Sequence, residues 1–504
     1  MQMIISSQAM RSCEQANFDA GLATPENLMQ IAGDGCTAEL LKFAACRQYR
    51  RIVIFAGKGN NGGDGIVIAD NLARAQQLPV ILALAAAPAE LSTCSQHFFA
   101  RLDARVKIVP AAEVELKNSD IIIDALLGTG CQTPMREPYR SLINKINQAT
   151  ATVFAVDLPS GLGSDCCVRA DFTAVIGFFK DQLFTDQGIE NSGILRRVEL
   201  PLPIRPQSTE KRVYASDIDF YCRSCRILPR QVHKYQRGSV VIAGGSRDYF
   251  QAPFLSGRAA LRNGAGMVHL AVPFAVAPGS GTLSLITAQM PGSDGYLSGK
   301  SFEAMNNILK KADVLAVGPG MGRAAVSGEF MEQVLNSQLP LVIDADALWH
   351  AAGMLEILRN RSAAAVLTPH RGEAALLAKA CNIVLSDDDE VAAQQLAGKT
   401  GSVVLLKGAR TVIADPAGDL YRNSSGTPAL ATAGSGDVLT GLIASEIAAG
   451  ANPLPQAVLR AAFLHGLAGE AGALEWGETG VIADDLAELA ARVKSRLYAH
   501  ADIF

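Results

Sequence analysis

The sequence predicts an α/β protein of two domains, each with helices covering a parallel sheet. Short apolar runs of strand length recur along the 504 residues and alternate with segments of helical periodicity. The proline-rich stretch Leu200–Pro206 interrupts this alternation. Proline is poorly tolerated in helix interiors and central strands, so a junction is expected there. We therefore expect one domain over residues 1–212 and a second over residues 213–504.

The composition disfavours several classes of protein. Hydrophobic residues make up 49% of the chain, which is enough for packed cores and argues against disorder. The 45 Lys and Arg residues against 49 Asp and Glu give a net charge of −4, which disfavours binding to nucleic acid or to an anionic membrane. No run approaches the roughly 20 apolar residues of a membrane span, and the first ten residues carry no charge typical of a secretory signal. We expect a cytoplasmic enzyme that acts on small molecules and forms a homo-oligomer.

The first domain begins its strand–helix alternation at Arg51–Ala56, an apolar run that enters a glycine-rich segment. Between this strand and the next, Gly65–Gln76 has apolar residues at helical spacing. Four further apolar runs predict buried strands, at Pro79–Leu84, Asp120–Asp124, Thr152–Asp157 and Asp171–Phe178.

The glycine-rich segment Gly57–Gly65 reads GKGNNGGDG and matches G-x-G-x-x-G at Gly57, Gly59 and Gly62. Glycines between a strand and a helix let backbone N–H groups approach a phosphate. A dinucleotide-binding fingerprint also has an acidic residue about 20 positions further on, which binds the ribose. Position 82 is Leu82, so an ordinary NAD dehydrogenase is disfavoured. The segment also lacks the G-K-[ST] ending of a P-loop.

Two aspartates, Asp124 and Asp157, end predicted strands and are followed by Gly128–Gly130 and by Ser160. A single aspartate after a strand is most often only a cap or turn residue. The carboxyl ends of parallel strands meet at one edge of a sheet, where ligands bind. The repeated pattern therefore predicts a site built from Asn60, Asn61, Asp64, Asp124, Asp157 and Ser160.

Four segments of this domain resemble NAD(P)H-hydrate epimerase: Leu28–Gly33, Gly57–Gly65, Asp124–Gly130 and Val156–Leu162. The resemblance implies a Rossmann-like three-layer α/β/α domain that interconverts the R and S epimers of hydrated NADH or NADPH. It also implies a potassium ion held by Asn61, Asp124 and Ser160, and oxygen ligands suit such a hard cation. The positions implied to contact the hydrate are Asn60, Asn61, Gly62, Gly63, Asp64, Gly128, Thr129, Gly130, Cys131, Gln132, Thr133, Pro134 and Asp157.

Epimerisation at C6 requires the hydroxyl-bearing carbon to lose and regain its substituent. The nicotinamide nitrogen can push water out while a carboxylate and its conjugate acid shuttle the proton, and we expect Asp157 to be this group. Lys180 lies near a lysine of the family and is given a supporting catalytic role, the alternative being a solvated surface lysine. The segments Gly161–Cys166 and Gly177–Asp181 depart from the family's usual sequence.

In the second domain, six apolar runs predict strands: Ser239–Ala243, Met267–Val272, Val314–Val317, Pro340–Asp344, Ala364–Leu367 and Ser402–Leu406. The turn Gly434–Asp437 then opens a predicted helix, Val438–Ala448. The free N–H groups of such a turn can stabilise an anion in phosphoryl transfer, and Asp437 can take a proton from the attacking hydroxyl. The alternative is a turn that only starts a helix.

Four other loops follow predicted strands of this domain: Gly244–Ser246, Gly318–Gly322, Thr368–His370 and Lys407–Thr411. All are expected at the carboxyl edge of the sheet, where ligands bind. His370 is interpreted as a substrate contact because of its place between a strand-ending Thr-Pro and a Gly-Glu pair. The other histidines considered, His269, His350 and His465, are expected to be structural.

These loops resemble those of the ribokinase-like family and, within it, ADP-dependent NAD(P)H-hydrate dehydratase. The matching segments include GGSRDYFQAP, VGPGMG, TPHRGE, LKGART and ATAGSGDVLTG, and they imply a ribokinase-like α/β/α domain. The implied reaction transfers phosphate from ADP, with Mg²⁺, to the C6 hydroxyl of the S-hydrate and then eliminates it. Implied hydrate contacts are Ala252, Gly320, His370 and Asp437. Implied nucleotide contacts are Lys407, Gly408, Ala409, Arg410, Thr411 and Gly436.

The two resemblances explain each other, because a dehydratase that accepts one epimer leaves the other unrepaired. We therefore expect a bifunctional nicotinamide-nucleotide repair enzyme. One alternative is a ribokinase-like kinase for a small molecule such as a vitamin precursor, with a non-catalytic N-terminal ligand-binding module. Another is a non-enzymatic module like those of RNA-decapping factors. The presence of Asp124, Asp157 and Ser160 favours catalysis.

Overall fold

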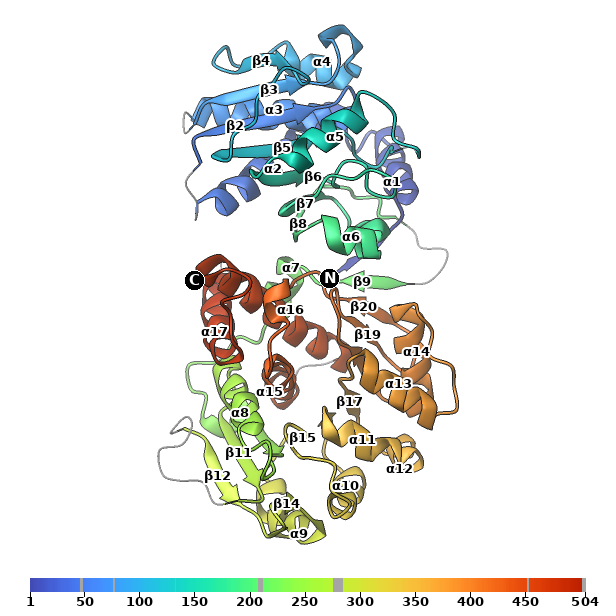
Figure 1. Ribbon diagram of the computed structural model, residues 1–504, viewed down its shortest axis with the longest axis vertical. Coiled ribbons are helices and arrows are strands. Elements are labelled where there is room, and N and C mark those ends of the chain that lie inside the picture. Colours follow the sequence, from blue (N-terminus) through green and yellow to red (C-terminus); the bar gives the residue numbers. More distant parts are fainter. Residues whose placement is uncertain are drawn as a thin grey trace. The chain divides into compact units, whose positions relative to one another are not determined.

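The computed structural model describes residues 1–45, 49–75, 78–131, 133–206, 212–274, 284–450 and 453–500 (Figure 1). The chain forms two compact units, Gln2–Arg212 and Val213–Phe504, and Met1 belongs with the second. Among the described residues, no helix has both the length and the apolar character needed to cross a membrane.

The first unit is built on a parallel sheet with the strand order β4-β3-β2-β5-β6-β7-β8. Its strands are β2 (Arg51–Ala56), β3 (Val80–Leu84), β4 (Lys107–Pro110), β5 (Asp120–Ala125), β6 (Thr152–Val156), β7 (Phe172–Ile176) and β8 (Ile194–Val198). A short strand, β1 (Gln2–Met3), precedes them in the sequence and is not part of this sheet. Its helices are α1 (Ser7–Asp19), α2 (Pro25–Ala44), α3 (Asn60–Ala75), α4 (Thr93–Phe99), α5 (Tyr139–Gln148) and α6 (Asp186–Asn191), with 3₁₀ turns at Pro88–Glu90 and Asp181–Phe184.

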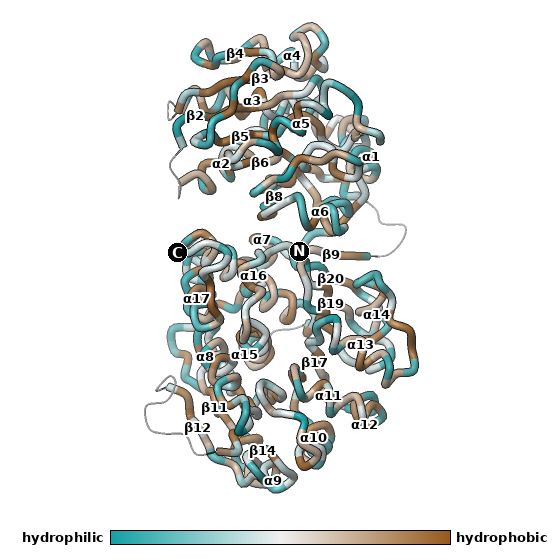
Figure 2. The backbone as a smooth tube through the Cα atoms, in the orientation of Figure 1, coloured by the Kyte–Doolittle hydropathy of each residue, from teal (hydrophilic) through white to brown (hydrophobic). Residues whose placement is uncertain are grey.

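Two layers of helices cover this sheet. Alternate strand residues such as Ile52 and Ile54 pack against α2 and α3, whereas Val53 and Phe55 pack against α5 on the other face. The five predicted strands are confirmed, and most of their residues are buried and apolar, as is typical of central strands in a parallel sheet (Figure 2). The edge strands β4 and β8 were not predicted: β4 is largely exposed and β8 carries two arginines.

The second unit has the strand order β9-β20-β19-β18-β17-β16-β15-β10-β11-β12. Its strands are β9 (Val213–Ala215), β10 (Ser239–Ala243), β11 (Met267–Val272), β12 (Ile286–Gln289), β15 (Val314–Val317), β16 (Leu341–Ile343), β17 (Ala365–Leu367), β18 (Val403–Leu406), β19 (Val412–Ala414) and β20 (Leu420–Arg422); β13 (Gly292–Ser293) and β14 (Tyr296–Leu297) form a separate pair. The six predicted strands are confirmed. The expectation of a purely parallel sheet is wrong at one end, because β19 is antiparallel to both β18 and β20.

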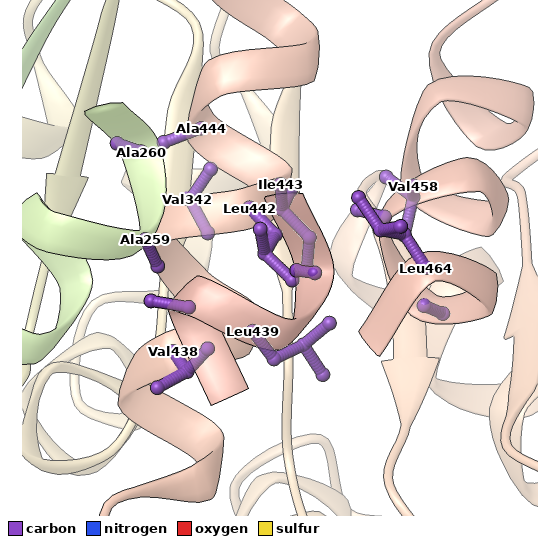
Figure 3. Close-up of a cluster of buried hydrophobic side chains, with 14 of the residues drawn as sticks. Ala259, Ala260, Val342, Val438, Leu439, Leu442, Ile443, Ala444, Val458 and Leu464 are labelled. Carbon is purple, nitrogen blue, oxygen red and sulfur yellow. The ribbon is translucent and has the colours of Figure 1, made fainter. Parts of the chain in front are cut away.

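Helices also cover both faces of the second sheet. They are α7 (Ile218–Ser224), α8 (Ala252–Asn263), α9 (Gly299–Leu309), α10 (Ser327–Leu335), α11 (Asp346–Ala352), α12 (Leu355–Arg359), α13 (Arg371–Ala380), α14 (Asp389–Thr400), α15 (Ser435–Ala448), α16 (Leu454–Trp476) and α17 (Ala483–His500), with 3₁₀ turns at Lys234–Arg237 and Pro428–Leu430. On one face, α8, α15 and α16 pack on strand residues such as Val342 (Figure 3). This buried packing fixes the start of α15, which carries the Gly434–Asp437 turn.

Two candidate active sites

The first unit contains a cavity of about 700 Å³ at the carboxyl ends of its central strands. Successive strands follow one another outward from β2 to β4 on one side of the sheet and from β5 to β8 on the other, so the topological switch point lies between β2 and β5. Open α/β sheets bind ligands at such a point. The volume is within the range of about 300–1,000 Å³ typical of small-molecule sites. The polar residues of its lining are Arg11, Glu14, Lys58, Asn60, Asn61, Asp64, Thr129, Arg136, Glu137, Tyr139, Asp157 and Lys180.

Asp157 and Lys180 form an ion pair in this cavity. The Asp157 carboxylate also accepts a hydrogen bond from the backbone N–H of Ile176 at 3.1 Å, and the Lys180 ammonium donates to the carbonyl of Ile176 at 2.6 Å. The side chain of Lys180 is only 1% exposed, so the alternative of a solvated surface lysine is wrong. Asp157 has a φ of 67°, a strained backbone conformation for a residue other than glycine, and such strain clusters at functional sites.

Asp124 and Ser160 are buried together, and neither is part of the cavity lining. The Ser160 hydroxyl donates to Oδ1 of Asp124 at 2.6 Å, and the backbone N–H of Ser160 donates to Oδ2 at 2.7 Å. Burial raises the pKa of Asp124 to about 6, although the bonds from Ser160 oppose the shift. The strand-end positions and the turn after β6 thus bring together two residues that lie 36 apart in the sequence.

Asn61 supplies the third residue expected at a cation site. Its side-chain nitrogen Nδ2 is buried and has no hydrogen-bond partner among the described residues. The assignment of O and N in an asparagine amide follows from its hydrogen bonds, so an unpartnered buried end is compatible with the oxygen facing a cation. Together with the carboxylate of Asp124 and the hydroxyl of Ser160, this donor set of one charged and two neutral groups fits a monovalent hard cation.

The glycine-rich segment is more helical than expected. Helix α3 begins at Asn60, five residues before the predicted start at Gly65, so the loop ends at Gly59. Gly62 and Gly63 are buried inside the first turn and do not line the cavity. A Cβ on Gly62 would lie 1.9 Å from the carbonyl oxygen of Gly57, so glycine is needed there for close backbone packing. Asn60 accepts a hydrogen bond from the Ser92 hydroxyl at 2.9 Å.

The loop after β5 contributes part of the expected hydrate-binding segment. Gly128, Thr129 and Gly130 line the cavity, and Arg11 of α1 donates to the carbonyl of Thr129 at 2.9 Å. The next described residues, Cys131, Thr133 and Pro134, are not part of the cavity lining, and Gln132 lies outside the described residues.

The sequence interpretation missed Glu14, which lines the same cavity from α1. Burial raises the pKa of Glu14 to about 7, and the negative charge of Asp157 adds to the shift. Burial also raises the pKa of Asp64 well above its usual range. Helix α1 precedes the strand–helix alternation and carries no motif, so only a tertiary contact could have revealed Glu14.

In the second unit, the expected site residues gather around Asp344, which the sequence interpretation did not single out. Lys407 donates to Oδ1 of Asp344 at 2.7 Å, and the hydroxyl of Thr440 donates to Oδ2 at 2.7 Å. Burial alone would raise the pKa of Asp344, but the Lys407 ammonium and these hydrogen bonds hold it below its usual value. Burial disfavours the charged form of Lys407, yet Asp344 and Glu373 raise its pKa.

Asp437 lies in the first turn of α15, beside this cluster. Burial raises the pKa of Asp437 to about 7, with a further contribution from the charge of Asp344. A Cβ on Gly436 would lie 3.5 Å from Nζ of Lys407, so the turn and the lysine are close neighbours. The hydroxyl of Ser256 in α8 donates to the Asp437 carbonyl at 2.7 Å and fixes the turn. A carboxyl with a pKa near neutrality is suited to general base catalysis.

His465 is closer to this site than expected. Its Nε2 lies 3.1 Å from the Ser435 hydroxyl, at the start of α15. Burial lowers the pKa of His465 to about 4, so the ring is neutral and adds no charge to the turn. Of the other two histidines that were expected to be structural, His350 is buried with Nε2 3.1 Å from the Gly322 carbonyl, and His269 is half-buried in β11.

The remaining expected contacts surround the same sheet edge. His370 caps α13, accepts from the Gly372 N–H at 3.0 Å and is exposed. Gly320, with a φ of 63°, is packed so that a Cβ would lie 3.1 Å from that of Ala252. In the segment after β18, Gly408 and Ala409 are exposed and Thr411 donates to the Gly408 carbonyl at 2.9 Å. Arg410 is buried, and its guanidinium donates to the Ser424 carbonyl at 2.6 Å.

Comparisons with known proteins match both units. A family model for NAD(P)H-hydrate dehydratase matches residues 240–492, and a model for the YjeF-related protein N-terminus matches residues 25–182. The bifunctional NAD(P)H-hydrate repair enzyme of Moorella thermoacetica is 35% identical over 463 residues, covering 87% of this chain and 86% of that protein. The enzyme of the same name from Salinibacter ruber is 34% identical and covers 98% and 96%. Among solved structures, the chain is similar to the ADP/ATP-dependent NAD(P)H-hydrate dehydratase of Bacillus subtilis, which was co-crystallised with ATP and Mg²⁺. The two sequences are 26% identical, and the TM-score is 0.45. The match covers 56% of this chain and 97% of that one.

Proposed function

Because this chain belongs to the family of bifunctional NAD(P)H-hydrate repair enzymes, we propose that residues 1–212 hold the epimerase site and residues 213–504 the dehydratase site. The protein is an NAD(P)H-hydrate epimerase and dehydratase. Family membership does not favour the alternatives of a vitamin-precursor kinase or a non-catalytic binding module. The assignment rests above all on the presence in one chain of two separate carboxylate-bearing sites, around Asp157 and around Asp437.

In the epimerase site, Asp157 would move the proton that accompanies loss and return of the C6 hydroxyl. Its place in the cavity and its ion pair with Lys180 support this role, since the lysine holds the carboxylate in a defined position. We assign hydrate contacts to Asn60–Asp64 and to Gly128–Pro134. The support is strongest for the cavity-lining residues Asn60, Asn61, Asp64 and Gly128–Gly130.

Asn61, Asp124 and Ser160 would hold a potassium ion at this site. Such a cation supplies positive charge beside the substrate phosphates. The buried, unpartnered amide end of Asn61 and the oxygens of Asp124 and Ser160 support the assignment.

Replacing potassium by choline at constant ionic strength should slow conversion of the R-hydrate without slowing dehydration of purified S-hydrate. Ser160→Ala removes one oxygen ligand and should raise the potassium concentration that gives half-maximal epimerisation by roughly tenfold or more. The measurement is the initial rate of R-hydrate consumption against potassium concentration. An epimerisation rate that is the same in both salts, for both proteins, would remove potassium from the site.

In the dehydratase site, Asp437 would accept the proton of the C6 hydroxyl as that oxygen attacks the terminal phosphate of the nucleotide. The raised pKa of Asp437 and its place in the α15 turn support this role. The N–H groups of this turn and the Lys407 ammonium would stabilise the charge on the transferred phosphoryl group. Departure of phosphate from C6, driven by the nicotinamide nitrogen, would leave a C6=N bond, and loss of a proton from C5 to solvent then restores the C5=C6 bond of the dihydronicotinamide ring.

We assign the nucleotide, ADP with Mg²⁺, to Lys407–Thr411 and Gly436, and the S-hydrate to Ala252, Gly320, His370 and Asp437. The proximity of Gly436 to Lys407, and of Gly320 to Ala252, supports these two groupings. The guanidinium of Arg410 already donates a hydrogen bond to the Ser424 carbonyl, so we assign the contact of Arg410 with the nucleotide to its backbone. Mg²⁺ commonly binds through one or two carboxylates together with substrate phosphates, and Asp344 supplies a carboxylate here. The proposed function is tested by giving the purified protein ADP and both hydrate epimers and following the return of NADH.

A further inference from the structure

We propose that Glu14 is a second proton-transfer residue of the epimerase site and shares the acid–base work with Asp157. This inference rests on the proposed epimerase function of residues 1–212. It assigns a catalytic role to helix α1, which lies before the first strand of the unit's parallel sheet in the sequence.

The position of α1 brings Glu14 into the cavity. Met10, Glu14 and Phe18 are four residues apart and all line the cavity, as expected for one face of a helix. Arg11 of the same helix donates to the carbonyl and the hydroxyl of Thr129, at 2.9 and 3.2 Å, and so attaches α1 to the loop after β5. Glu14 therefore shares one cavity with Asp157.

The Glu14 carboxyl has no hydrogen bond or ion pair within the described part of the chain. The same is true of Asp64, whose side chain lines the cavity although the residue is only 8% exposed. Asp157, in contrast, is held by Lys180 and Ile176. Glu14 is half-buried, so its carboxyl faces the cavity without a protein partner among the residues described and is free to contact a polar ligand or water there.

The charges around Glu14 favour exchange of its proton near neutral pH. Burial and the Asp157 charge raise the pKa of Glu14 to about 7, whereas Lys180 and Arg11 oppose the shift. Asp64 faces the same cavity, and its pKa is raised by burial and by the charges of Asp157 and Glu14. A carboxyl with a pKa near the working pH can donate a proton in one step and accept one in another.

Two proton-transfer groups suit a reaction that must use both faces of C6. The lone pair of the nicotinamide nitrogen forms a C6=N bond as the C6–O bond breaks, and the leaving oxygen takes the proton of Glu14 and departs as water. A second water then adds to the opposite face of C6 and gives its proton to the Asp157 carboxylate, while the C6=N electron pair returns to nitrogen. One water leaves and one enters, and exchange with solvent restores the two carboxyls. The reverse reaction exchanges their roles.

Glu14→Gln keeps the size of the side chain and removes its proton. In the full-length protein, supplied with purified R-hydrate and excess ADP, this variant should form NADH about 10²-fold more slowly than wild type. NADH formation from purified S-hydrate should be unchanged. The pH profile is measured on conversion of R- to S-hydrate without ADP, so that the ionisation of Asp437 does not enter. The wild-type rate should then depend on an ionisation near pH 7, which Glu14→Gln lacks and Glu14→Asp retains together with part of the rate. The matched control is Asp19→Asn, an exposed carboxyl on the same helix that bonds to Gln15, and its rate and pH profile should match wild type.

The outcomes separate this inference from the proposed function. If Glu14→Gln converts R-hydrate at the wild-type rate and with the wild-type pH profile, while Asp157→Asn does not convert it, the role of Glu14 is wrong and the epimerase assignment stands. If neither variant loses conversion, the proposed epimerase site is wrong as well. If Glu14→Gln and Glu14→Asp lose activity equally, and the residual activity keeps the wild-type pH profile, the effect is structural and the inference is overturned.

Discussion

Replacing Asp437 by alanine should lower ADP-dependent recovery of NADH from the S-hydrate by a factor of about 10² or more. The carboxyl lies in the first turn of α15, beside Lys407 and Asp344, and burial raises its pKa to about 7. Alanine cannot accept the proton of the C6 hydroxyl, so attack on phosphate loses its base. Because the base acts when deprotonated, the wild-type rate should also rise with pH through about 7. The measurement is the initial rate of NADH formation from S-hydrate at several pH values.

The Asp437→Ala protein should still interconvert the R and S epimers, because the epimerase site belongs to the other unit. The matched control is Glu356→Ala, which removes an exposed carboxyl from the first turn of α12 and should leave dehydration unchanged. Near-normal dehydration by Asp437→Ala would show that Asp437 is not the base.

Replacing Asp157 by asparagine should leave repair of the S-hydrate fast and reduce repair of the R-hydrate to its spontaneous rate. Asparagine keeps the shape of the side chain but cannot take up the proton, and it leaves the buried Lys180 ammonium without its carboxylate. Breaking a buried ion pair costs about 3–5 kcal/mol, so this variant should also lower the thermal stability of the first unit. The measurements are NADH formation from each purified epimer and the unfolding temperature.

The double variant Asp157→Asn/Lys180→Met separates chemistry from stability. Removing the unpaired ammonium should restore much of the lost stability without restoring conversion of the R-hydrate. Recovery of R-hydrate conversion together with stability would contradict a catalytic role for Asp157.

The interior strands of both sheets were predictable because they are buried on both faces and consist mostly of apolar residues, as in residues 52–56 and 240–243. The strands toward the sheet ends were not, since their pattern is weaker: β12 is partly exposed and β20 contains Arg422. The predicted start of α3 was also wrong, because glycine is a poor helix former and the glycines of this segment predicted a loop. In the structure the later ones lie in the first turns of the helix, where Gly62 allows close backbone packing.

The site residues that end strands could be predicted from the sequence, since parallel strands bring their carboxyl ends to one edge. Asp124 and Asp157 are of this kind, whereas the Gly434–Asp437 turn was predictable from its own glycines at the start of α15. Glu14, Asp344 and His465 were not identified as site residues because their importance depends on tertiary contacts. His465 reaches Ser435 across 30 residues, and Arg11 attaches α1 to Thr129 across 118 residues. Such contacts leave no local pattern of spacing.

The central claim is that one chain repairs both epimers at two separate sites. The most direct measurement is the full time course of NADH absorbance when the wild-type protein receives excess ADP and an equilibrium mixture of R- and S-hydrates. We predict two phases: a first that consumes the S-hydrate, and a second, faster than spontaneous epimerisation, that consumes the R-hydrate until recovery of NADH is complete. A time course in which the second phase proceeds no faster than epimerisation without protein would contradict the claim.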